Sequence, residues 1–545
     1  MVVPAHGMKN QTIILSALLA AILSFGGNVR ASGAFVIDGQ KDTVICQLAD
    51  GQTGGCHAVS VGSVRQRGKI WSFPYHGESN FPLVVVNGKA KRYMQTEVHD
   101  CRLALSPMSD DETDGGSGTA NYSFVLKWND DVPPRAVYDQ SFLFVHYKWL
   151  TLRFKVVSVF ADDGSITGTL FTSTPSHHIP IAGKEVGCWI EIVNPKTDYP
   201  GNISDDCFVY DGNMIHYKSP GLENPQRQDI AIADEGTLLV IRNCRNVTIR
   251  GLHFRNNGIR DITHGSGCQA EVLTKPCVLI ENSDSITIED CEFSEVMGYC
   301  VTAYGNRRPL NNIVIRNCSV HDTFGGGFHL TGCHNSSIDN NLISRFGLVQ
   351  GGAVGVLLRD DTEGCNVTRN TVCYGPYTGI SLGWTWGYNG NYGVNGRYQE
   401  SRTVNNVIAH NHVHHCMNRR SDDGGGIYTL GESRGTVIRN NHIHDIFSRK
   451  ERNSCAMYFD EGSSHIVFQD NVCHDCEHGV HIHYGYDLEI SRNVFWNCSS
   501  EAIFLSRPER VPEGQEAYRE YGNTVGAVGD GPLDINTDDY GCQPR

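Results

Sequence analysis

The segments VIAHNHV (407–413), VIRNNHI (437–443) and IVFQDNV (466–472) repeat one phrase, and this phrase decides the fold. From the lead residues Ile408, Ile438 and Phe468, an asparagine follows three positions later, and another apolar residue (Val413, Ile443 or Cys473) follows two positions after that. Such alternation of apolar and polar residues is typical of a half-buried strand. The same phrase recurs along the chain as ITIEDCEF (286–293), IVIRNCSV (313–320), SSIDNNLI (336–343), NVTRNTV (366–372) and LEISRNVF (488–495).

The spacing of the phrases indicates a solenoid. The lead residues are Ile249, Ile288, Ile315, Ile338, Val367, Ile408, Ile438, Phe468 and Ile490. A coil of roughly 22–30 residues with occasional loop insertions reproduces this series. We therefore expect an all-β chain whose main body is a right-handed parallel β-helix, with a β-rich N-terminal region that contains a sandwich-like subdomain.

Two further columns of the repeat support this fold. In most coils an asparagine stands three positions after the lead residue, and Cys291 and Cys318 occupy this position in earlier coils. Asparagine tolerates left-handed backbone angles, and stacked amides about 4.8 Å apart can hydrogen-bond to one another. We expect these residues to form an interior ladder. They are Asn341, Asn370, Asn411, Asn441, Asn471 and Asn493. The second column, expected to point inward, is Phe254, Phe293, Val320, Ile343, Val372, Val413, Ile443, Cys473 and Phe495.

A second strand in each coil carries the candidate binding surface. The segments GVLLRD (355–360), GISLGW (379–384), GIYTLG (426–431), AMYFDE (456–461) and GVHIHY (479–484) align on it. Alternate residues of these strands must point outward. This outward row predicts a long groove for an extended polar ligand, with exposed tyrosines stacking on sugar rings. The expected binding residues in the row are His329, Arg359, Tyr428, Tyr458, His481 and His483.

Two acidic clusters lie in adjacent coils beside this row. SDDGGGIY (421–428) is interpreted as a carboxylate pair at a glycine-rich turn, and YFDEGSS (458–464) ends the next coil's strand. Hydrolysis of a glycosidic bond needs a proton donor and a second carboxylate, so Asp423 and Asp460 are the catalytic candidates. Asp423 precedes its strand and Asp460 follows its own, so simple stacking does not bring them face to face. Asp422 and Glu461 are expected to bind substrate.

The insertion GWTWGYNGNYG (383–393) separates two coils. Tryptophan and tyrosine among glycines would be costly as an exposed loop without a task. We expect Trp384 and Trp386 to form a sugar-binding wall, and the alternative is a loop folded onto the solenoid surface.

The ends of the chain define the other domains. An apolar run from Ile13 to Phe25 with small residues near Ala31 predicts a signal peptide over residues 1–31. Residues 32–240 form the N-terminal region that we expect to cap the solenoid, residues 241–505 the β-helix, and residues 506–545 a C-terminal cap. The protein is therefore expected to be secreted or periplasmic, with no membrane insertion after signal removal.

The composition excludes several classes of function. The chain has 545 residues and a net charge of −15, which argues against nucleic-acid binding because phosphates need a basic surface. No dinucleotide or phosphate-binding loop is convincing, so no cofactor is expected. We expect a monomer that takes a polysaccharide or oligosaccharide as its substrate. The 20 cysteines could pair in an oxidising compartment, but their spacing gives no connectivity.

The histidine-rich phrases HNHVHH (410–415) and HIHD (442–445) invite a metal-site interpretation. Their histidines occupy polar positions of repeat strands, and no compact ligand set has the usual spacing of a zinc site. We therefore interpret them as surface or ladder residues and expect no metal site.

The segments SDDGGGIYTLG (421–431), GISLGWTWGY (379–388) and MYFDEGSS (457–464) resemble bacterial secreted β-helix proteins similar to glycoside hydrolase family 141, of the pectate-lyase-like superfamily. LVIRNCRNVTIRGLHF (239–254) is also similar to that group. The resemblance implies action on plant cell-wall glycans, including fucosidase and xylanase activities. It also implies catalytic aspartates at Asp423 and Asp460, although the neighbouring Asp422 and Glu461 leave each assignment open by one position.

Two other functions stay open on the sequence. A polysaccharide lyase acting on a uronate-containing glycan would need a basic residue such as Arg359, and calcium to neutralise the uronate. Asp360 and Asp361 follow that arginine. A non-catalytic carbohydrate-binding surface protein is the other alternative, because one fold hosts many functions.

Overall fold

The structure is a computed structural model, and it describes most of the chain. The described residues are 2–4, 35–46, 56–96, 99–107, 120–128, 137–159, 166–172, 186–197, 202–233, 236–263, 269–306, 308–384, 401–417, 421–449, 454–527 and 540–542. The apolar run from Ile13 to Phe25, Ala31 and Trp386 lie outside these residues. The signal peptide therefore stays a prediction. In the described residues, no helix is both long and apolar enough to span a membrane.

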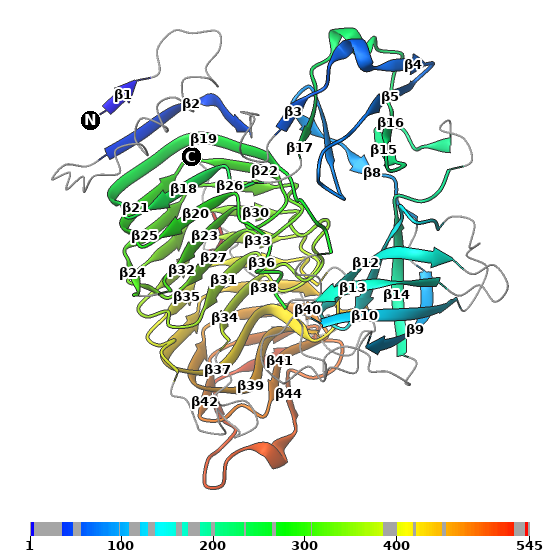
Figure 1. Cartoon of the computed structure of the whole chain (residues 1–545). Helices are drawn as coiled ribbons and strands as arrows, with labels where there is room; N and C mark the ends of the chain where they lie inside the picture. The colour runs from blue at the N-terminus through cyan, green and yellow to red at the C-terminus, as the bar shows by residue number, and fades with distance from the viewer. Residues whose placement is uncertain are drawn as a thin grey trace.

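The predicted right-handed parallel β-helix is confirmed, and its coils stack into three parallel sheets (Figure 1). Sheet 1 contains β18 (Leu239–Arg242), β20 (Val278–Glu281), β23 (Val301–Tyr304), β27 (Phe328–Thr331), β31 (Val356–Arg359), β34 (Ile380–Gly383), the first parts of β37 (Gly424–Arg439) and β39 (Ser454–Gln469), β41 (His478–His483) and β44 (Ile503–Ser506).

Sheet 2 contains the first part of β19 (Arg245–Asn257), β21 (Asp284–Glu289), β25 (Ile313–Arg316), β29 (Ser337–Asp339), β32 (Asn366–Thr368), β35 (Val407–Ala409), the last parts of β37 and β39, β42 (Leu488–Ser491) and β45 (Tyr518–Tyr521). Sheet 3 contains the last part of β19, β22 (Glu292–Val296), β26 (Ser319–His321), β30 (Leu342–Ser344), β33 (Thr371–Cys373), β36 (His412–His414), β38 (His442–Ile446), β40 (Val472–Cys476), β43 (Val494–Trp496) and β46 (Thr524–Gly526).

The predicted inward columns form the core of the solenoid. The lead residues pair in register from Ile249 and Ile288 to Phe468 and Ile490, and all nine are buried or nearly so. The second column pairs in the same way on sheet 3, from Phe254 to Phe495. Because each coil contributes one apolar residue to each column, the stacked columns form a continuous apolar core.

The asparagine ladder is confirmed as a chain of buried amides between sheets 2 and 3. The Asn411 amide donates to Asn441 Oδ1 at 2.9 Å and accepts from the Asn370 amide at 3.0 Å. The ladder continues to Asn523 beyond the predicted repeat. The left-handed residue of each turn is the one before the ladder asparagine, such as Arg369 (φ 52°) and Asn440 (φ 51°). The ladder asparagines themselves are not among the residues with positive φ.

The solenoid extends past both predicted boundaries. β2 (Phe35–Cys46) lies parallel to β19, with Ile37 opposite Ile249, so a first rung precedes residue 241. β1 (Val2–Pro4) pairs with β2 in turn. At the other end, β45 and β46 continue sheets 2 and 3 beyond residue 505. About 200 residues of inserted chain separate β2 from β19, which hides this rung from a search for periodicity.

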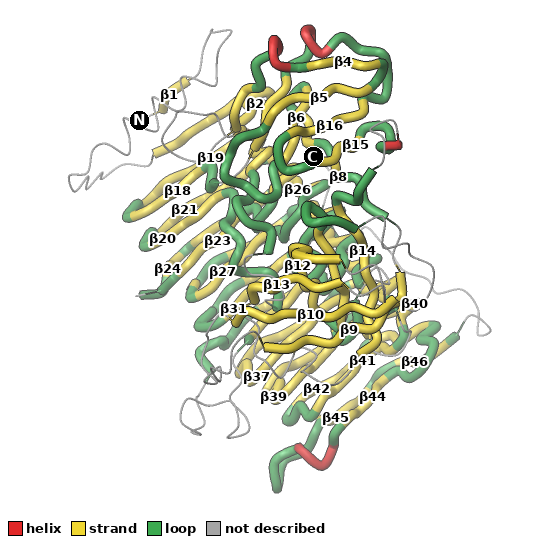
Figure 2. The backbone as a smooth tube through the Cα atoms, turned by 45° about the vertical axis from the view of Figure 1, so that its right-hand side comes forward, coloured by secondary structure: helices red, strands yellow, loops and turns green. Residues whose placement is uncertain are grey.

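The insertion folds into two small sheets and a closed antiparallel barrel of six strands. The expected sandwich is therefore a barrel, and Figures 1 and 2 show it on the flank of the solenoid and not as a cap on its end. The barrel strands are β9 (His99–Pro107), β10 (Ala120–Trp128), β11 (Phe142–Tyr147), β12 (Leu150–Val159), β13 (Ile166–Thr172) and β14 (Val186–Val193).

The two small sheets are held by their own aromatic core, which includes Trp71, Phe73 and Phe208. The first is formed by β4 (Arg65–Arg67), β5 (Ile70–Pro74), β16 (Met214–Lys218), β15 (Cys207–Tyr210) and β8 (Arg92–Tyr93). The second is formed by β3 (Cys56–Ala58), β17 (Ile230–Ala233), β6 (Leu83–Val86) and β7 (Lys89–Ala90). β24 (Leu310–Asn311) and β28 (Cys333–His334) form a short separate pair.

A buried ion pair fixes the barrel to the solenoid. The Arg153 Nη1 donates to Glu271 Oε1 at 2.8 Å, and its Nε donates to the Ile262 carbonyl at 2.7 Å. The side chains of Arg153 and Glu271 are 0 % and 1 % exposed. Losing either partner would leave an uncompensated buried charge, so this pair sets the position of β12 against the solenoid. Among the cysteines whose side chains are described, all are free thiols.

Candidate active site

The outward columns of sheet 1 have the predicted register. His329, Leu357, Ser381, Tyr428, Tyr458 and His481 succeed one another across the strands. The parallel column runs through Arg359, Gly383, Leu430 and Asp460. Strand alternation alone was enough to find these columns, because each residue pairs with its equivalent in the next coil.

Two tyrosines connect the candidate carboxylates. The Tyr458 hydroxyl donates to Asp423 Oδ1 at 2.7 Å, and the Tyr428 hydroxyl donates to Asp460 Oδ2 at 2.5 Å. The two tyrosine rings meet edge to face, with their centroids 5.3 Å apart. Each tyrosine thus binds a carboxylate from the neighbouring coil. The two hydrogen-bonded pairs of Asp423 and Asp460 therefore meet through the contact of the tyrosine rings. Asp423 directly precedes β37, whereas Asp460 lies within β39 and does not follow its strand as expected.

The backbone at Asp423 brings its side chain to the cluster. Asp423 has a left-handed φ of 62° directly before β37 begins at Gly424. The Tyr377 hydroxyl donates to the Asp423 carbonyl at 3.1 Å. The chain direction therefore changes at the aspartate, and Tyr377 holds the changed backbone in place.

The expected glycine-rich turn is wrong, because Gly424, Gly425 and Gly426 all belong to β37. A Cβ at Gly425 would lie 2.8 Å from the Cys455 carbonyl oxygen, and one at Gly426 would lie 2.5 Å from Ile443 Cγ2. Real side chains do not fit at these distances. The glycines are therefore required by close packing inside the solenoid, not by a turn.

The barrel contributes a loop to the site. Lys148, in the turn between β11 and β12, accepts a hydrogen bond through its carbonyl from the Asp422 backbone amide at 3.1 Å. Asp422 is 5 % exposed and so is held in the contact between the barrel and the solenoid. Sequence reasoning missed both Lys148 and Tyr377, since neither belongs to the acidic clusters and only the fold brings them near Asp423.

The environment of Asp423 favours its protonated form. Burial and the charge of Asp460 raise the pKa of Asp423 to about 6, although the Tyr458 hydroxyl and the charges of His483 and Lys148 lower it. Burial and the Asp460 charge also raise the pKa of Glu461. A carboxyl with a raised pKa suits proton donation near neutral pH.

Asp460 has a hydrogen-bond partner at each carboxylate oxygen. His483 Nδ1 lies 2.8 Å from Asp460 Oδ1, while Tyr428 occupies the other oxygen, so both oxygens accept hydrogen bonds. Burial alone would lower the pKa of His483, but its hydrogen bond to Asp460 and the charges of Asp460, Asp423 and Glu461 raise it. The side chains of Asp460 and His483 are 13 % and 25 % exposed, so solvent reaches this pair.

The expectation of exposed tyrosines is wrong. Tyr428 and Tyr458 are each 1 % exposed, so their rings cannot stack on a sugar. His481 stacks on Tyr458 with ring centroids 4.4 Å apart, and the ring centroids of Trp384 and Tyr428 lie 5.9 Å apart. The aromatic rings therefore cover one another, and the tyrosines hold the carboxylates instead of forming the floor of a groove.

The other predicted binding residues lie further along sheet 1 or away from the carboxylates. Trp384 is 3 % exposed and donates to Ser381 Oγ at 2.9 Å, and the Arg359 guanidinium lies 5.5 Å from its ring centroid. His329 is also buried, and burial and the charge of Arg359 lower its pKa to about 3. Burial lowers the pKa of His481 to about 3. These buried groups do not form an open sugar-binding wall.

The carboxylates beside Arg359 lie close to cationic side chains. Asp360 Oδ2 lies 3.0 Å from the Arg359 Nε, and Asp361 Oδ2 lies 3.6 Å from Arg402 Nη1. Calcium prefers several oxygen ligands that are free to coordinate, whereas these carboxylates already face cationic side chains.

One cavity of about 330 Å³ lies elsewhere on the solenoid. It is bordered by residues of β39, β42 and β45, including His465, Glu489 and Arg519. The predicted catalytic and binding residues do not border it, so this cavity does not bear on the acidic cluster.

Comparison with known proteins supports the fold. The family model described as a right-handed beta helix region matches residues 276–383 and 354–509. Comparison with curated protein sequences found no match. A solved structure titled "Glycoside hydrolase" aligns with a TM-score of 0.62 at 16 % identity, over 94 % of this chain and 86 % of that chain.

Two further solved structures align less well. The complex of XylC with xylose has a TM-score of 0.43 at 10 % identity, over 89 % of this chain and 75 % of that one. The mannuronan C-5 epimerase AlgE4 A-module of Azotobacter vinelandii has a TM-score of 0.38 at 14 % identity, over 52 % of this chain and 71 % of that one. The first alignment is the one of the three with a TM-score above 0.5, and at 16 % identity it concerns fold alone. The chain thus has the right-handed parallel β-helix fold, in an arrangement similar to that of a glycoside hydrolase.

Proposed function

We propose that this protein is an exported glycoside hydrolase that cleaves a plant or algal cell-wall polysaccharide with Asp423 and Asp460. The observation that carries the proposal is the cluster in which Tyr458 holds Asp423 and Tyr428 holds Asp460. Two carboxyl groups with different surroundings are the arrangement that glycoside hydrolysis requires.

The surroundings assign a role to each carboxyl. Asp423, with its raised pKa, is the general acid that donates its proton to the leaving glycosidic oxygen. Asp460, whose two oxygens accept hydrogen bonds, is the carboxylate that attacks the anomeric carbon or removes a proton from the attacking water. Water supplies the hydroxyl of the new reducing end in either case, and the proton given up by Asp423 leaves with the departing sugar.

The neighbouring residues position the pair. His483 orients Asp460, and the barrel turn at Lys148 holds the backbone of Asp422 beside Asp423. Glu461 lies next to Asp460 and is proposed to bind sugar hydroxyls, whereas the buried Asp422 is proposed to support the backbone beside Asp423. Support for a glycan substrate also comes from the likeness of the chain to a solved glycoside hydrolase and from the resemblance to glycoside hydrolase family 141.

A glycan panel tests the proposal. Xylan, fucosylated xyloglucan, pectin and alginate are incubated with the purified protein, and new reducing ends and ultraviolet absorbance are both measured. Hydrolysis predicts new reducing ends without the absorbance of an unsaturated product. Ultraviolet absorbance that rises with turnover would instead identify a lyase and refute the hydrolase.

Two substitutions separate an enzyme from a carbohydrate-binding protein. Asp423→Asn and Asp460→Asn are each expected to lower turnover by at least 100-fold, in line with the loss of acid–base catalysis (about 10²–10⁴-fold). Asp470→Asn is the matched control, because Asp470 lies in the same coil but is paired with Arg492 at 2.7 Å. Equal activity in all three variants would contradict the assignment, and glycan binding without any turnover would indicate a binding protein.

A further inference from the structure

Sheet 3 carries an array of imidazoles that the carboxylate site does not use. β36, β38 and β40 place His412 beside His442, and His414, His444 and His474 in one column. The rings of His412 and His442 stack with centroids 4.8 Å apart and planes 1° apart. Residues about 30 positions apart in the sequence thus meet because consecutive coils stack.

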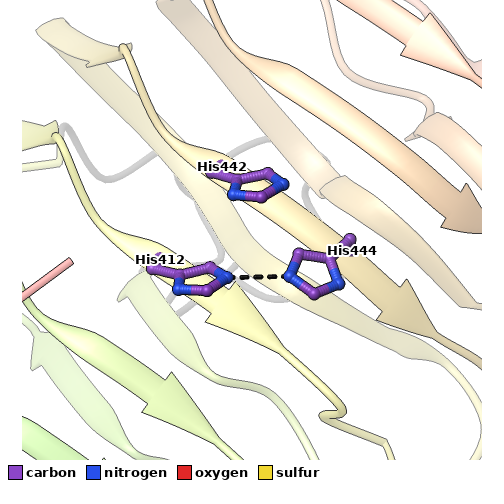
Figure 3. Close-up of side chains that lie close together, drawn as sticks. All are labelled: His412, His442 and His444. Atoms are coloured by element: carbon purple, nitrogen blue, oxygen red, sulfur yellow. Dashed lines mark hydrogen bonds between the residues drawn. The ribbon is translucent and has the colours of Figure 1, made fainter. Parts of the chain in front are cut away.

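The nitrogens of this array converge. The Nε2 atoms of His412 and His444 lie 2.7 Å apart, and this contact is the dashed line in Figure 3. The Nε2 atoms of His442 and His474 also lie 2.7 Å apart. His412, His442 and His444 each offer a nitrogen, and the three nitrogens lie within 4.8 Å of one another. Three imidazole nitrogens at such separations can bind one ion.

Carboxylates fix the orientation of two rings. His444 Nδ1 lies 2.6 Å from Asp445 Oδ2, and His474 Nδ1 lies 2.6 Å from Asp475 Oδ2. An ionised carboxylate only accepts, so both Nδ1 atoms donate, and each Nε2 keeps a lone pair directed toward the next imidazole. Metal-binding histidines typically donate their second N–H to a carboxylate in this way.

The array is also partly sheltered from solvent. His442 is 3 % exposed, and its buried Nδ1 has no hydrogen-bond partner. The ring of Tyr540 lies 5.3 Å from that of His442, and the Gly541 amide donates to the His410 carbonyl at 2.8 Å. The C-terminal segment 540–542 therefore packs against the array.

We propose that His412, His442 and His444 form a binding site for a divalent transition metal, with zinc as the first candidate. Imidazole nitrogens suit zinc, copper and nickel, and zinc binds them at about 2.0–2.1 Å, which separates two ligands by roughly 3.3 Å. Binding in this geometry requires the three side chains to rotate from the positions in which their nitrogens lie within 4.8 Å of one another. The ion would tie consecutive coils together beside the C-terminal segment.

Zinc binding to the full chain, prepared without a polyhistidine tag and treated with a chelator, tests the site. Isothermal titration is expected to give one zinc ion per chain at micromolar affinity or better, and bound cobalt is expected to show the visible absorption of a tetrahedral site. His444→Gln and His412→Gln are each expected to weaken binding at least tenfold. His444→Gln also removes the second possible group, formed with His415 and Asp445.

His321→Gln is the matched control. His321 lies in the same column of sheet 3 and contacts Asp322 at 3.1 Å, as His444 contacts Asp445, but its column neighbours are Ser294 and Ser344. This variant should bind zinc like the parent. Absence of stoichiometric binding, or equal affinity in all three variants, would overturn the proposal. Circular dichroism checks folding, and if His444→Gln does not fold, the half-buried His412→Gln decides the question.

Discussion

The Tyr458→Phe substitution tests the proposed acid directly, because it removes one hydroxyl and keeps the ring that packs against Tyr428. The lost hydrogen bond to Asp423 Oδ1 is 2.7 Å long and stabilises the ionised carboxylate. A hydrogen bond to a charged group contributes about 1.5–3 kcal/mol. Since one pKa unit corresponds to about 1.4 kcal/mol, the pKa of Asp423 should rise by about 1–2 units.

The sign of the effect on activity follows from the role of Asp423. A general acid works only while it is protonated, so activity falls as pH rises through its pKa. The alkaline limb of kcat/KM is therefore expected near pH 6 in the parent and about 1–2 units higher in Tyr458→Phe.

The assay measures release of reducing ends from pH 4 to 9 on the glycan that the panel identifies. Tyr428→Phe is the matched control, since its hydroxyl binds Asp460 and not Asp423. It should change the rate while leaving the alkaline limb near its original pH. An alkaline limb that stays in place or moves to lower pH in Tyr458→Phe would refute Asp423 as the acid.

Three further predictions concern the scaffold, and each is measured as the free energy of unfolding in urea. Asn411→Ala removes an amide that bonds to neighbours above and below, so it should cost about 3 kcal/mol, and an unchanged unfolding midpoint would contradict the ladder. Arg153→Met leaves Glu271 buried without its cation and should cost about 3–5 kcal/mol, whereas a stabilised variant would show that the pair is dispensable. Gly426→Ala should lower the free energy of unfolding by about 1–3 kcal/mol, because the new Cβ would lie 2.5 Å from the Ile443 side chain. An unchanged stability would mean that the backbone of the coil shifts to make room for the methyl group.

The solenoid was predicted well from the sequence because equivalent positions of the repeat stack on one another in successive coils. The lead column from Ile249 to Ile490 and the asparagine ladder were both recognised from positions within the phrase, and both pair as expected. The outward register of Tyr428, Tyr458 and Asp460 followed from strand alternation. The position of a residue in the fold can thus be predicted from the sequence when it pairs with the equivalent residue of the next coil.

The features that could not be predicted from the sequence depend on contacts between segments that are not equivalent in the repeat. The burial of Tyr428 and Tyr458 arises from their edge-to-face packing and from rings such as His481, which alternation alone does not reveal. The approach of Lys148 to Asp422 depends on how the barrel docks, and β12 docks through an ion pair with Glu271. The convergence of the histidines was missed because their ligand spacing is measured across coils and not along the chain.

The position of β2 has a consequence for how the molecule assembles. Its partner β19 follows only after about 200 residues, so β2 cannot pair with β19 until the barrel and both small sheets have been synthesised. Closing a loop of this length costs on the order of 5 kcal/mol of chain entropy, unless the intervening domains fold first and bring its ends together. Coils that pair with their immediate successors face no such delay. The rung formed by β2 is therefore expected to close more slowly than the rungs formed by consecutive coils.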